Sequence, residues 1–483
     1  MDIVKNVEIA EHVENVESVE SVDKVDKNAV ERQAERQSEN RMGVTPVHKL
    51  LLSMSIPMVI SMLVQALYNV VDSIFVAQIS ENALTAISLA FPIQSLMIAV
   101  GVGTGVGINS FLSRSLGEKN FDNANKAAAN GMFLAWASCA AFMAVGALGS
   151  AAFFRAQTNI QEIVQHGQDY LSIICIFSFG MFNQITLERL LMSTGKSFYA
   201  MVSQSVGAVI NIVLDPVMIF GLWNFPKMGV AGAAYATVIG QSAGALLALY
   251  FNLRKNHEIK LWGRGFRPNG AIIKRIYAVG LPSILMASLG SVMTYGINSI
   301  LISFTATAAA VFGVYFKLQS FVFMPVFGVN NGMVPILAFN FGAKKKDRIT
   351  QTIKIAVMYA VGIMSLGIAA FQFYPDKLLA LFNATEDMLS IGIPALRIIS
   401  IHYAFAGFCI VFISVFQALG NGLESLFIAV TRQLILLLPM AWLLSLTGNV
   451  DAIWWSFPAA ECFTFALSAA LMKRVYNKRI KNM

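Results

Sequence analysis

The segment YNVVDSIFV, residues 68–76, places Asp72 in an apolar run that holds no other charged residue. A carboxylate inside a bilayer costs about 2.5–3.5 kcal/mol on insertion scales, so such residues usually have a function. At helical spacing Gln65, Tyr68 or Asn69, and Asp72 share one face. We therefore expect this carboxylate to have polar neighbours on its own helix.

A second acid lies in NIVLDP, residues 211–216, where Asn211 and Asp215 are four residues apart and share a helix face. Both acids come late in apolar segments that we expect to run outward, so the two carboxylates lie at similar depth. Burial and a like-charged neighbour both favour a carboxylate that has bound a proton or a cation. Pro216 removes one backbone hydrogen bond and predicts a bend beside Asp215. The alternative is a pair of structural, hydrogen-bonded aspartates.

Thr237, in the segment GAAYATVIG, could add a hydroxyl ligand to these groups. We predict a cation-binding or coupling site formed by four residues: Asp72, Asn211, Asp215 and Thr237. The ion would be H⁺ or Na⁺ held by the two aspartates. No other metal is expected, because the cysteines and histidines are scattered without the spacing of a ligand set.

Six further polar residues inside apolar segments are candidates for substrate binding: Gln65, Tyr68, Asn69, Glu188, Asn298 and Lys317. Glu188 is followed by Arg189 and lies near the inner interface. A structural role is therefore as well supported there as a functional one.

The second half of the chain differs from the first in its charges. Asn298 corresponds to Asp72 and cannot titrate, so ion coupling should belong to the first half. Lys317 could face a cavity. Arg432 and Glu461 are one conceivable ion pair across helices.

The 483 residues are 56% hydrophobic and 13% charged, with a mean hydropathy of +0.64. Soluble domains carry about twice that share of charge. Apolar stretches of roughly 20 residues or more, enough to cross a bilayer, recur along the chain. We predict an all-α polytopic membrane protein with twelve transmembrane helices in two pseudo-symmetric six-helix lobes. The expected spans are 50–79, 83–113, 122–152, 168–194, 198–222, 229–253, 273–303, 307–340, 348–373, 391–419, 423–447 and 451–473.

The basic residues gather in connections that would lie on one side of the membrane: 114–126, 196, 254–275, 344–354 and 473–481. The opposite loops hold only Arg155, Lys227 and Lys377. By the positive-inside rule both termini are cytoplasmic, in the cell (inner or plasma) membrane. Topology thus accounts for the net charge of +8, and a nucleic-acid partner is not expected.

Residues 1–45 hold eleven acidic and six basic residues, and their valines recur every three residues. This period fits neither a 3.6-residue helix face nor a heptad, so we predict a disordered acidic tail, with binding of a partner as the alternative. It would be followed by a first lobe at 46–253, a basic cytoplasmic linker at 254–272 and a second lobe at 273–483.

The sequence repeats itself at a shift of 225 residues. The matched positions include Pro57 and Pro282, Gln94-Ser95 and Gln319-Ser320, Gly103 and Gly328, Gly107 and Gly332, Gly117 and Gly342, and Gly195 and Gly420. Each half starts inside, so the repeats are parallel and related by an axis along the membrane normal. In that architecture substrate binds between two lobes that expose it alternately.

The glycine run GVGTGVG, residues 101–107, lies in the middle of a span and lacks GK[ST], so it predicts helix packing rather than nucleotide binding. No serine or cysteine beside a histidine supports a nucleophilic site. His402, the one histidine within a span, should form a hydrogen bond inside the bundle. We expect no enzyme activity, no cofactor and no nucleotide partner.

The paired lobes, YNVVDSIFV, GEKNFDNA, NIVLDP and GAAYAT resemble the multidrug and toxic compound extrusion (MATE) family, and NIVLDPVMIFG and SFPAAECFTFALSA resemble its prokaryotic MepA-like branch. The resemblance covers residues 46–478. It implies a first-lobe cation site at Asp72, Asn211, Asp215 and Thr237, and a role in drug binding or coupling for Glu188. Acids that some branches carry in spans seven and ten are absent here, so a second-lobe sodium site is not implied.

These observations predict a secondary active multidrug efflux transporter that exports cationic or amphipathic organic compounds in exchange for protons or sodium ions. We expect it to work as a monomer in the lipid bilayer. The alternative is a lipid-linked precursor flippase or polysaccharide exporter of the same superfamily. A transporter-like receptor without flux is a third interpretation.

Overall fold

The computed structural model describes residues 40–261, 266–382 and 384–483, and all regular structure in these ranges is helical. Residues up to Thr45 form a unit of their own. In it, α2 (Arg41–Val44) begins after Asn40, whose Oδ1 accepts a hydrogen bond from the Met42 backbone N–H at 2.8 Å. Most of the expected tail therefore lies outside the described residues.

The helices of the first lobe follow the predicted spans within a few residues: α3 (Val47–Ala77), α4 (Glu81–Gly117), α5 (Phe121–Arg155), α6 (Gln161–Ile176), α7 (Phe179–Ser193), α8 (Ser197–Phe220), the 3₁₀ helix η1 (Leu222–Asn224) and α9 (Val230–Lys255). Its buried core draws on all of these α-helices, and its largest side chains include Phe154 of α5, Tyr170 of α6 and Phe182 of α7.

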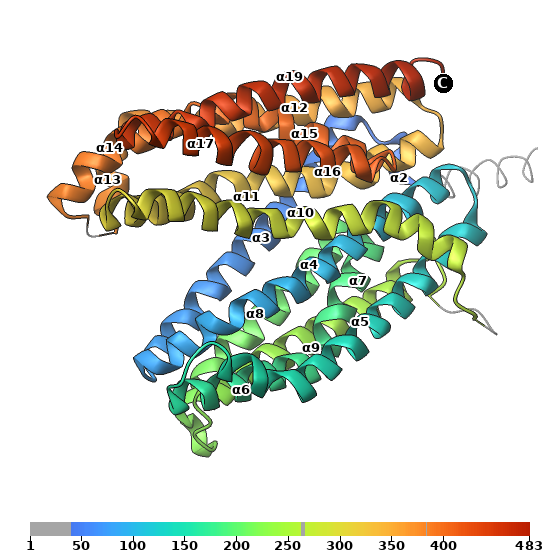
Figure 1. Cartoon of the computed structure of the whole chain (residues 1–483). Coiled ribbons are helices and arrows are strands. Elements are labelled where there is room, and N and C mark those ends of the chain that lie inside the picture. Colours follow the sequence, from blue (N-terminus) through green and yellow to red (C-terminus); the bar gives the residue numbers. More distant parts are fainter. Residues whose placement is uncertain (1–39, 262–265, 383) are drawn as a thin grey trace, which may run out of the picture. The chain divides into compact units, whose positions relative to one another are not determined.

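The second lobe contains α10 (Gly270–Ile302), α11 (Ala306–Gly342), α12 (Lys346–Phe373), α13 (Pro375–Ala380), α14 (Glu386–Ser400), α15 (Tyr403–Ala418), α16 (Gly422–Val430), the π-helix η2 (Thr431–Leu437), α17 (Leu438–Ser445), α18 (Val450–Trp454), α19 (Ser456–Val475) and a second π-helix, η3 (Tyr476–Ile480). Figure 1 shows these helices in chain order from yellow to red.

Nine helices of the described residues are long and apolar enough to cross a membrane, and two bent pairs raise the number to eleven. The twelfth expected span, 451–473, coincides with α18 and α19. Its mean hydropathy is lower than that of the helices counted as membrane-spanning. The reason is its composition, because the twenty residues of α19 include Glu461, Lys473 and Arg474. The protein is thus an all-helical polytopic membrane protein with two lobes.

The fourth and tenth expected spans are each broken into two helices, which the sequence did not predict. The helices α6 and α7 meet at 46°, and α14 and α15 meet at 50°. The breaks lie near Phe177 and Ile401, about one repeat length apart. By contrast, α8 continues through Pro216 as a single helix.

The caps at the starts of α4 and α11 are related by the same 225-residue shift as the sequence repeat. Ser80 Oγ caps α4 by accepting from Ala83 N at 3.0 Å, and Thr305 Oγ1 caps α11 by accepting from Ala308 N at 3.0 Å. Such caps satisfy amide donors that the first turn leaves free. The lobes are therefore related in local geometry as well as in sequence.

Gly195 and Gly420 occupy the same left-handed turn in the two lobes, with φ values of 82° and 80°. Glycine is favoured there because it has no Cβ to clash with the backbone. This constraint explains why the two glycines match in the sequence repeat.

The connection between α9 and α10 includes the expected basic linker, of which residues 262–265 lie outside the described part of the chain. Two backbone amides hold the described remainder against α5. Lys260 N donates to Asn125 Oδ1 at 2.7 Å, and Asn269 N donates to Asn130 Oδ1 at 2.9 Å.

The two lobes meet where α4 packs on α10 and α11 packs on α3 (Figure 1). A Cβ atom at Gly103 would lie 2.7 Å from the backbone nitrogen of Ile284 on α10. Its repeat partner Gly328 would place a Cβ 2.8 Å from the backbone nitrogen of Val59 on α3. These glycines let helices of opposite lobes approach to backbone contact, as small residues do in membranes.

Further contacts between the lobes lie toward the end of the molecule where α3 and α10 begin. Ser55 Oγ donates to the Val329 carbonyl at 3.3 Å. The Arg114 guanidinium lies 5.0 Å from the centroid of the Phe341 ring. Because α3 and α10 begin at this end, and α4 and α11 finish there, it is the side that the charge pattern predicts to be cytoplasmic.

We expect Gly107→Ala to lower the midpoint of thermal unfolding, because its Cβ would collide with the Ile276 carbonyl on α10. Overpacking of this kind lowers the free energy of unfolding by about 1–3 kcal/mol. The matched control is Gly149→Ala in α5, where no atom lies within 4 Å of the added Cβ. Intrinsic fluorescence of the purified variants during heating measures both. Equal midpoints for the two variants would contradict this account of the lobe contact.

Candidate functional site

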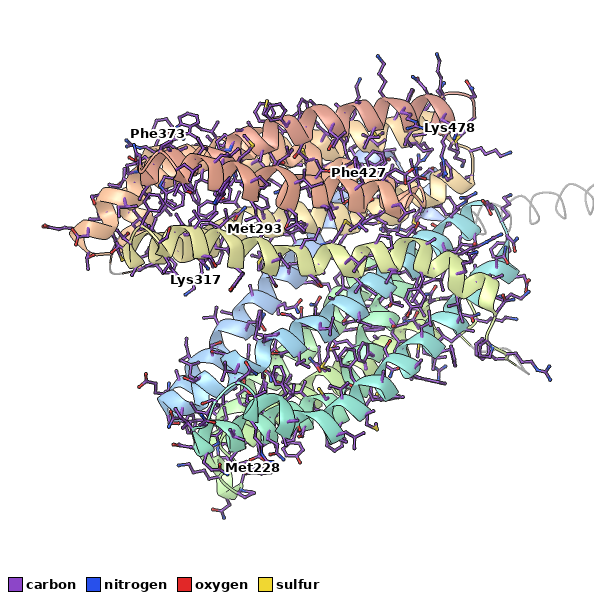
Figure 2. All side chains as sticks on the ribbon, viewed as in Figure 1. Met228, Met293, Lys317, Phe373, Phe427 and Lys478 are labelled. Carbon is purple, nitrogen blue, oxygen red and sulfur yellow. The ribbon has the colours of Figure 1, made fainter. Side chains whose placement is uncertain are left out.

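A cavity of about 830 Å³ lies between the two lobes and is lined by residues from both. Its volume falls in the range of sites for drug-sized molecules. Methionines of both lobes line the cavity, among them Met62 of α3 and Met293 of α10. Figure 2 labels Met293. Unbranched, polarisable methionine side chains adapt to ligands of different shape.

The four predicted cation-site residues come from three helices of the first lobe: α3 carries Asp72, α8 carries Asn211 and Asp215, and α9 carries Thr237. The Asn211 amide fits its surroundings best with its nitrogen donating to Asp215 Oδ2 at 3.1 Å. Its oxygen then accepts from the Thr237 backbone N–H at 3.0 Å and from the hydroxyl at 3.3 Å. Asn211 thus links the carboxylate to α9.

Asp72 completes the group from α3. Its Oδ1 is buried and has no hydrogen-bond partner among the described residues. The carboxylate is close enough to Asp215 for the two to interact electrostatically. The Tyr68 hydroxyl interacts with Thr237 and with both acids. We call Asp72, Asn211, Asp215, Thr237 and Tyr68 the acid cluster.

No basic side chain of the described residues forms an ion pair with either aspartate; the ion pairs lie elsewhere. Asp215 is completely buried, and Asn211 and Thr237 are each 2% exposed. The atoms of this group that could bind a cation are oxygens, which hard cations such as Na⁺ prefer. The arrangement therefore suits a proton or a small cation.

The two carboxylates do not line the cavity themselves. Tyr68, Asn211 and Thr237 do, and they stand between the acids and the space where a larger ligand would bind. An ion at the acids and a ligand in the cavity would thus be neighbours with separate contacts.

The candidate substrate residues of the first lobe all reach the cavity: Gln65, Tyr68, Asn69 and Glu188. Gln65 accepts a hydrogen bond from Gln204 of α8 at 2.9 Å. Glu188 accepts one from Gln184 at 3.0 Å. Arg189 does not pair with Glu188; its Nη1 donates to Asn331 Oδ1 of the second lobe at 3.0 Å.

Neither Asn298 nor Lys317 of the second lobe lines the cavity. Lys317 is exposed on α11, and its ammonium lies 5.9 Å from the Phe382 ring centroid (Figure 2). The Asn298 Oδ1 is buried without a hydrogen-bond partner in the described part of the chain. Asn298 lies near the end of α10, beyond its last cavity-lining residue, Met293. Lys317 lies between the cavity-lining residues Phe316 and Gln319 of α11, but its side chain extends toward Phe382.

Arg432 and Glu461 form the ion pair that the sequence suggested, with Arg432 Nε 3.0 Å from Glu461 Oε2. Both line the cavity from the second lobe. His402 also lines it and is 2% exposed. Its Nδ1 lies 2.6 Å from the Ile399 carbonyl oxygen, which confirms the expected hydrogen bond inside the bundle.

Sequence reasoning missed residues of the site that are neutral. Tyr170 of α6 is 2% exposed and interacts with Gln94 and with both acids. Gln94 and its repeat partner Gln319 both line the cavity. The repeat itself was the available signal, because a glutamine matched between two apolar spans indicates a shared structural position.

The model of the MatE family matches residues 57–217 and again 282–443, which together exceed half of the chain. The two matches begin at Pro57 and Pro282, the first pair of the internal repeat.

Two curated relatives match most of the chain. One is "Multidrug export protein MepA" of Staphylococcus haemolyticus, 25% identical over 436 residues, which cover 89% of this chain and 94% of that protein. The other is the "FAD transporter" of Shewanella oneidensis, 24% identical over 413 residues, which cover 86% and 91%.

Solved structures share the fold. An outward-facing multidrug resistance MATE family transporter of the MOP superfamily has a TM-score of 0.84 and 24% identity, covering 91% of this chain and 98% of that one. A MOP superfamily transporter from Pyrococcus furiosus, described as having reversed pocket polarity, has a TM-score of 0.82 and 24% identity, covering 90% and 97%. On the two matches of the family model, this chain belongs to the MatE family.

Proposed function

We propose that the protein exports cationic or amphipathic organic compounds across the cell membrane and takes up protons or sodium ions in exchange. The observation that carries this proposal is the acid cluster, where two carboxylates lie behind the wall of a drug-sized cavity and have no basic partner in the described part of the chain. The name of the MepA relative, a multidrug export protein, supports the same class of substrate.

In the proposed cycle the ion and the organic compound compete through the acid cluster. With the ion absent, the two carboxylates supply negative potential to the cavity and favour a bound organic cation. When a proton or sodium ion reaches Asp72 or Asp215, that potential falls and the compound leaves. An ion can shift this equilibrium only by its difference in affinity between the two states.

The lobe contacts give the cycle its direction. They close the cavity at the end predicted to be cytoplasmic, so this arrangement would release substrate outward. Export requires the contacts of Gly103, Gly107, Gly328 and Gly332 to open while contacts form at the other end. Both termini would lie in the cytoplasm, and one chain contains the whole site, so a monomer suffices.

The driving force sets a limit on accumulation. One pH unit corresponds to about 1.4 kcal/mol for one proton. Exchange of one monovalent cation for one proton moves no net charge and gains nothing from the membrane potential. With that stoichiometry, the substrate gradient cannot exceed about tenfold per pH unit.

A second candidate function is export of anionic compounds such as dinucleotides or lipid-linked precursors. The name of the FAD transporter relative favours it, as do Arg189 and Arg432 in the cavity wall. It is weaker because Arg432 is already paired with Glu461 and Arg189 with Asn331. An anionic substrate would also lie close to the acid cluster, whose carboxylates form no ion pair among the described residues.

Asp72→Asn and Asp215→Asn should each slow ethidium efflux from expressing cells by about tenfold or more. Each variant removes one charged group that binds the ion, and this loss costs more than about 1.4 kcal/mol of binding free energy. The matched control is Asp122→Asn in α5, an exposed carboxylate paired with Lys126 at 2.6 Å. It should leave efflux unchanged. Wild-type efflux in both first variants, at equal expression, would remove the proposal.

Binding of the coupling ion should stabilise the folded protein. At one hundred times its Kd an ion adds about 2.7 kcal/mol. We expect the thermal midpoint of the purified protein to rise with sodium at constant ionic strength, or with falling pH in sodium-free buffer, according to which ion is used. The double variant Asp72→Asn/Asp215→Asn should lose that response. If both proteins respond identically to sodium and to pH, the ion does not bind at the acid cluster.

A further inference from the structure

We propose that the first lobe binds an anionic phospholipid of the inner leaflet on its lipid-facing surface, at the ends of α8 and α9 that are predicted to be cytoplasmic. These two helices pack against each other (Figure 1). The site combines a cluster of aromatic rings with two basic residues one helical turn beyond it. It lies away from the cavity between the lobes, and the inference does not depend on the proposed export function.

Four aromatic side chains contact one another where α8 begins and α9 ends. The ring centroids of Phe198 and Tyr199 are 5.8 Å apart, and those of Tyr199 and Phe251 are 4.8 Å apart. The Phe251 centroid lies 5.7 Å from that of Tyr250. The first and last rings of this series are exposed, Phe198 by 57% and Tyr250 by 53%. Exposed aromatic rings are enriched where a membrane protein crosses the membrane–water interface.

The lipid-facing side of α9 leads into this cluster. Leu246, Tyr250 and Leu253 lie on one side of the helix, and all three are exposed. In a bilayer such a stripe contacts the acyl chains. Tyr250 is twenty residues beyond Val230, where α9 begins, which is about 30 Å along the helix. Because the hydrocarbon core is about as thick, this ring lies at the depth of the lipid headgroups.

Two basic residues continue the same surface toward the aqueous side. Arg254 comes four residues after Tyr250 and is therefore one turn beyond it on the same face. Lys255 has the same relation to Phe251. Both basic side chains are exposed, and neither forms an ion pair with a described residue. The surface therefore passes from apolar to aromatic to basic within two turns.

The positive charge of this surface has no acid to balance it in the described part of the chain. Glu258 is the one acidic residue of the described linker, and its Oε1 lies 3.6 Å from Lys196 Nζ. Lys260 and Arg267 of the same linker are exposed and add further positive charge. A phospholipid phosphate supplies the negative charge, while its acyl chains lie along the exposed side of α9. Basic residues near a membrane surface attract anionic lipids in this way.

The second lobe provides an internal comparison, because the positions related by the 225-residue shift have different chemistry. Tyr250 corresponds to Val475, which is buried. Arg254 corresponds to Arg479, whose Nη1 donates a hydrogen bond to the Leu419 carbonyl oxygen at 3.1 Å. Topology places basic residues at the same end of both lobes. The aromatic cluster and the two bases without an acidic partner therefore indicate an additional use in the first lobe.

Binding of phosphatidylglycerol with a fluorescent acyl chain, followed by anisotropy with the purified full-length protein in neutral detergent, tests the inference. We expect Arg254→Gln/Lys255→Gln to weaken binding by about tenfold or more, because two charges beside the phosphate are lost. Labelled phosphatidylcholine, which has no net charge, should bind the wild-type protein about tenfold more weakly or less. The matched control is Lys473→Gln/Arg474→Gln, an adjacent exposed pair in α19 with alanines one turn earlier, which should leave binding unchanged.

A third variant and a soluble competitor separate a lipid site from a simple anion site. Tyr250→Leu keeps an apolar side chain and both bases but removes the exposed ring, so it should weaken phosphatidylglycerol binding by about threefold. Glycerol phosphate has the anionic group without acyl chains and should not displace the labelled lipid at equal concentration. Displacement by glycerol phosphate as effective as that by unlabelled phosphatidylglycerol would overturn the inference.

The substituted side chains are all exposed, so each variant should keep the wild-type midpoint of thermal unfolding. Unchanged phosphatidylglycerol binding in the Arg254/Lys255 variant overturns the inference, and so does an equal loss in the α19 control. These assays measure no transport. Their failure would therefore leave the proposed export function unaffected.

Discussion

The protein keeps two carboxylates inside a membrane lobe, and no basic side chain of the described residues forms an ion pair with either of them. Asp215 is tied to α9 through Asn211, while Asp72 presents an oxygen with no hydrogen-bond partner among the described residues. Such an arrangement is unfavourable unless an ion from outside the chain completes it. In our account the rest of the molecule serves that exchange, since the cavity brings a ligand close to those acids while Tyr68, Asn211 and Thr237 stand between the two.

The two lobes share a framework and differ in chemistry. Helix caps, left-handed turns and contact glycines recur at a fixed shift of the sequence. The charges do not recur. An aspartate pair occupies the first lobe, whereas an Arg432–Glu461 pair in a π-helical segment occupies the second. The lobes therefore differ in the charged groups that lie in or behind the cavity wall.

Much of this architecture was predictable because it depends on composition and repetition. The span limits agreed with the helices to within a few residues, and Gly103, Gly107 and their partners proved to be points of lobe contact. The breaks near Phe177 and Ile401 were not predictable, since no proline lies at either and the glycine at the first, Gly180, has no counterpart at the second. Lys317 was expected to face the cavity and does not line it. Helical spacing predicts which side chains share a face, but it does not predict which neighbouring helix that face contacts. For the same reason the sequence could not reveal that Tyr68, Asn211 and Thr237 separate the acids from the cavity.

The most direct test of the central claim is ion movement driven by substrate. Proteoliposomes loaded with ethidium, without any ion gradient, are diluted into dye-free buffer, and uptake of protons and of radioactive sodium is recorded. The account predicts that the wild-type protein moves one of these ions inward in fixed ratio to ethidium efflux, and that the Asp72→Asn/Asp215→Asn protein moves neither ion. Ethidium efflux without either ion in the wild type, or unchanged ion uptake in the double variant, would contradict it.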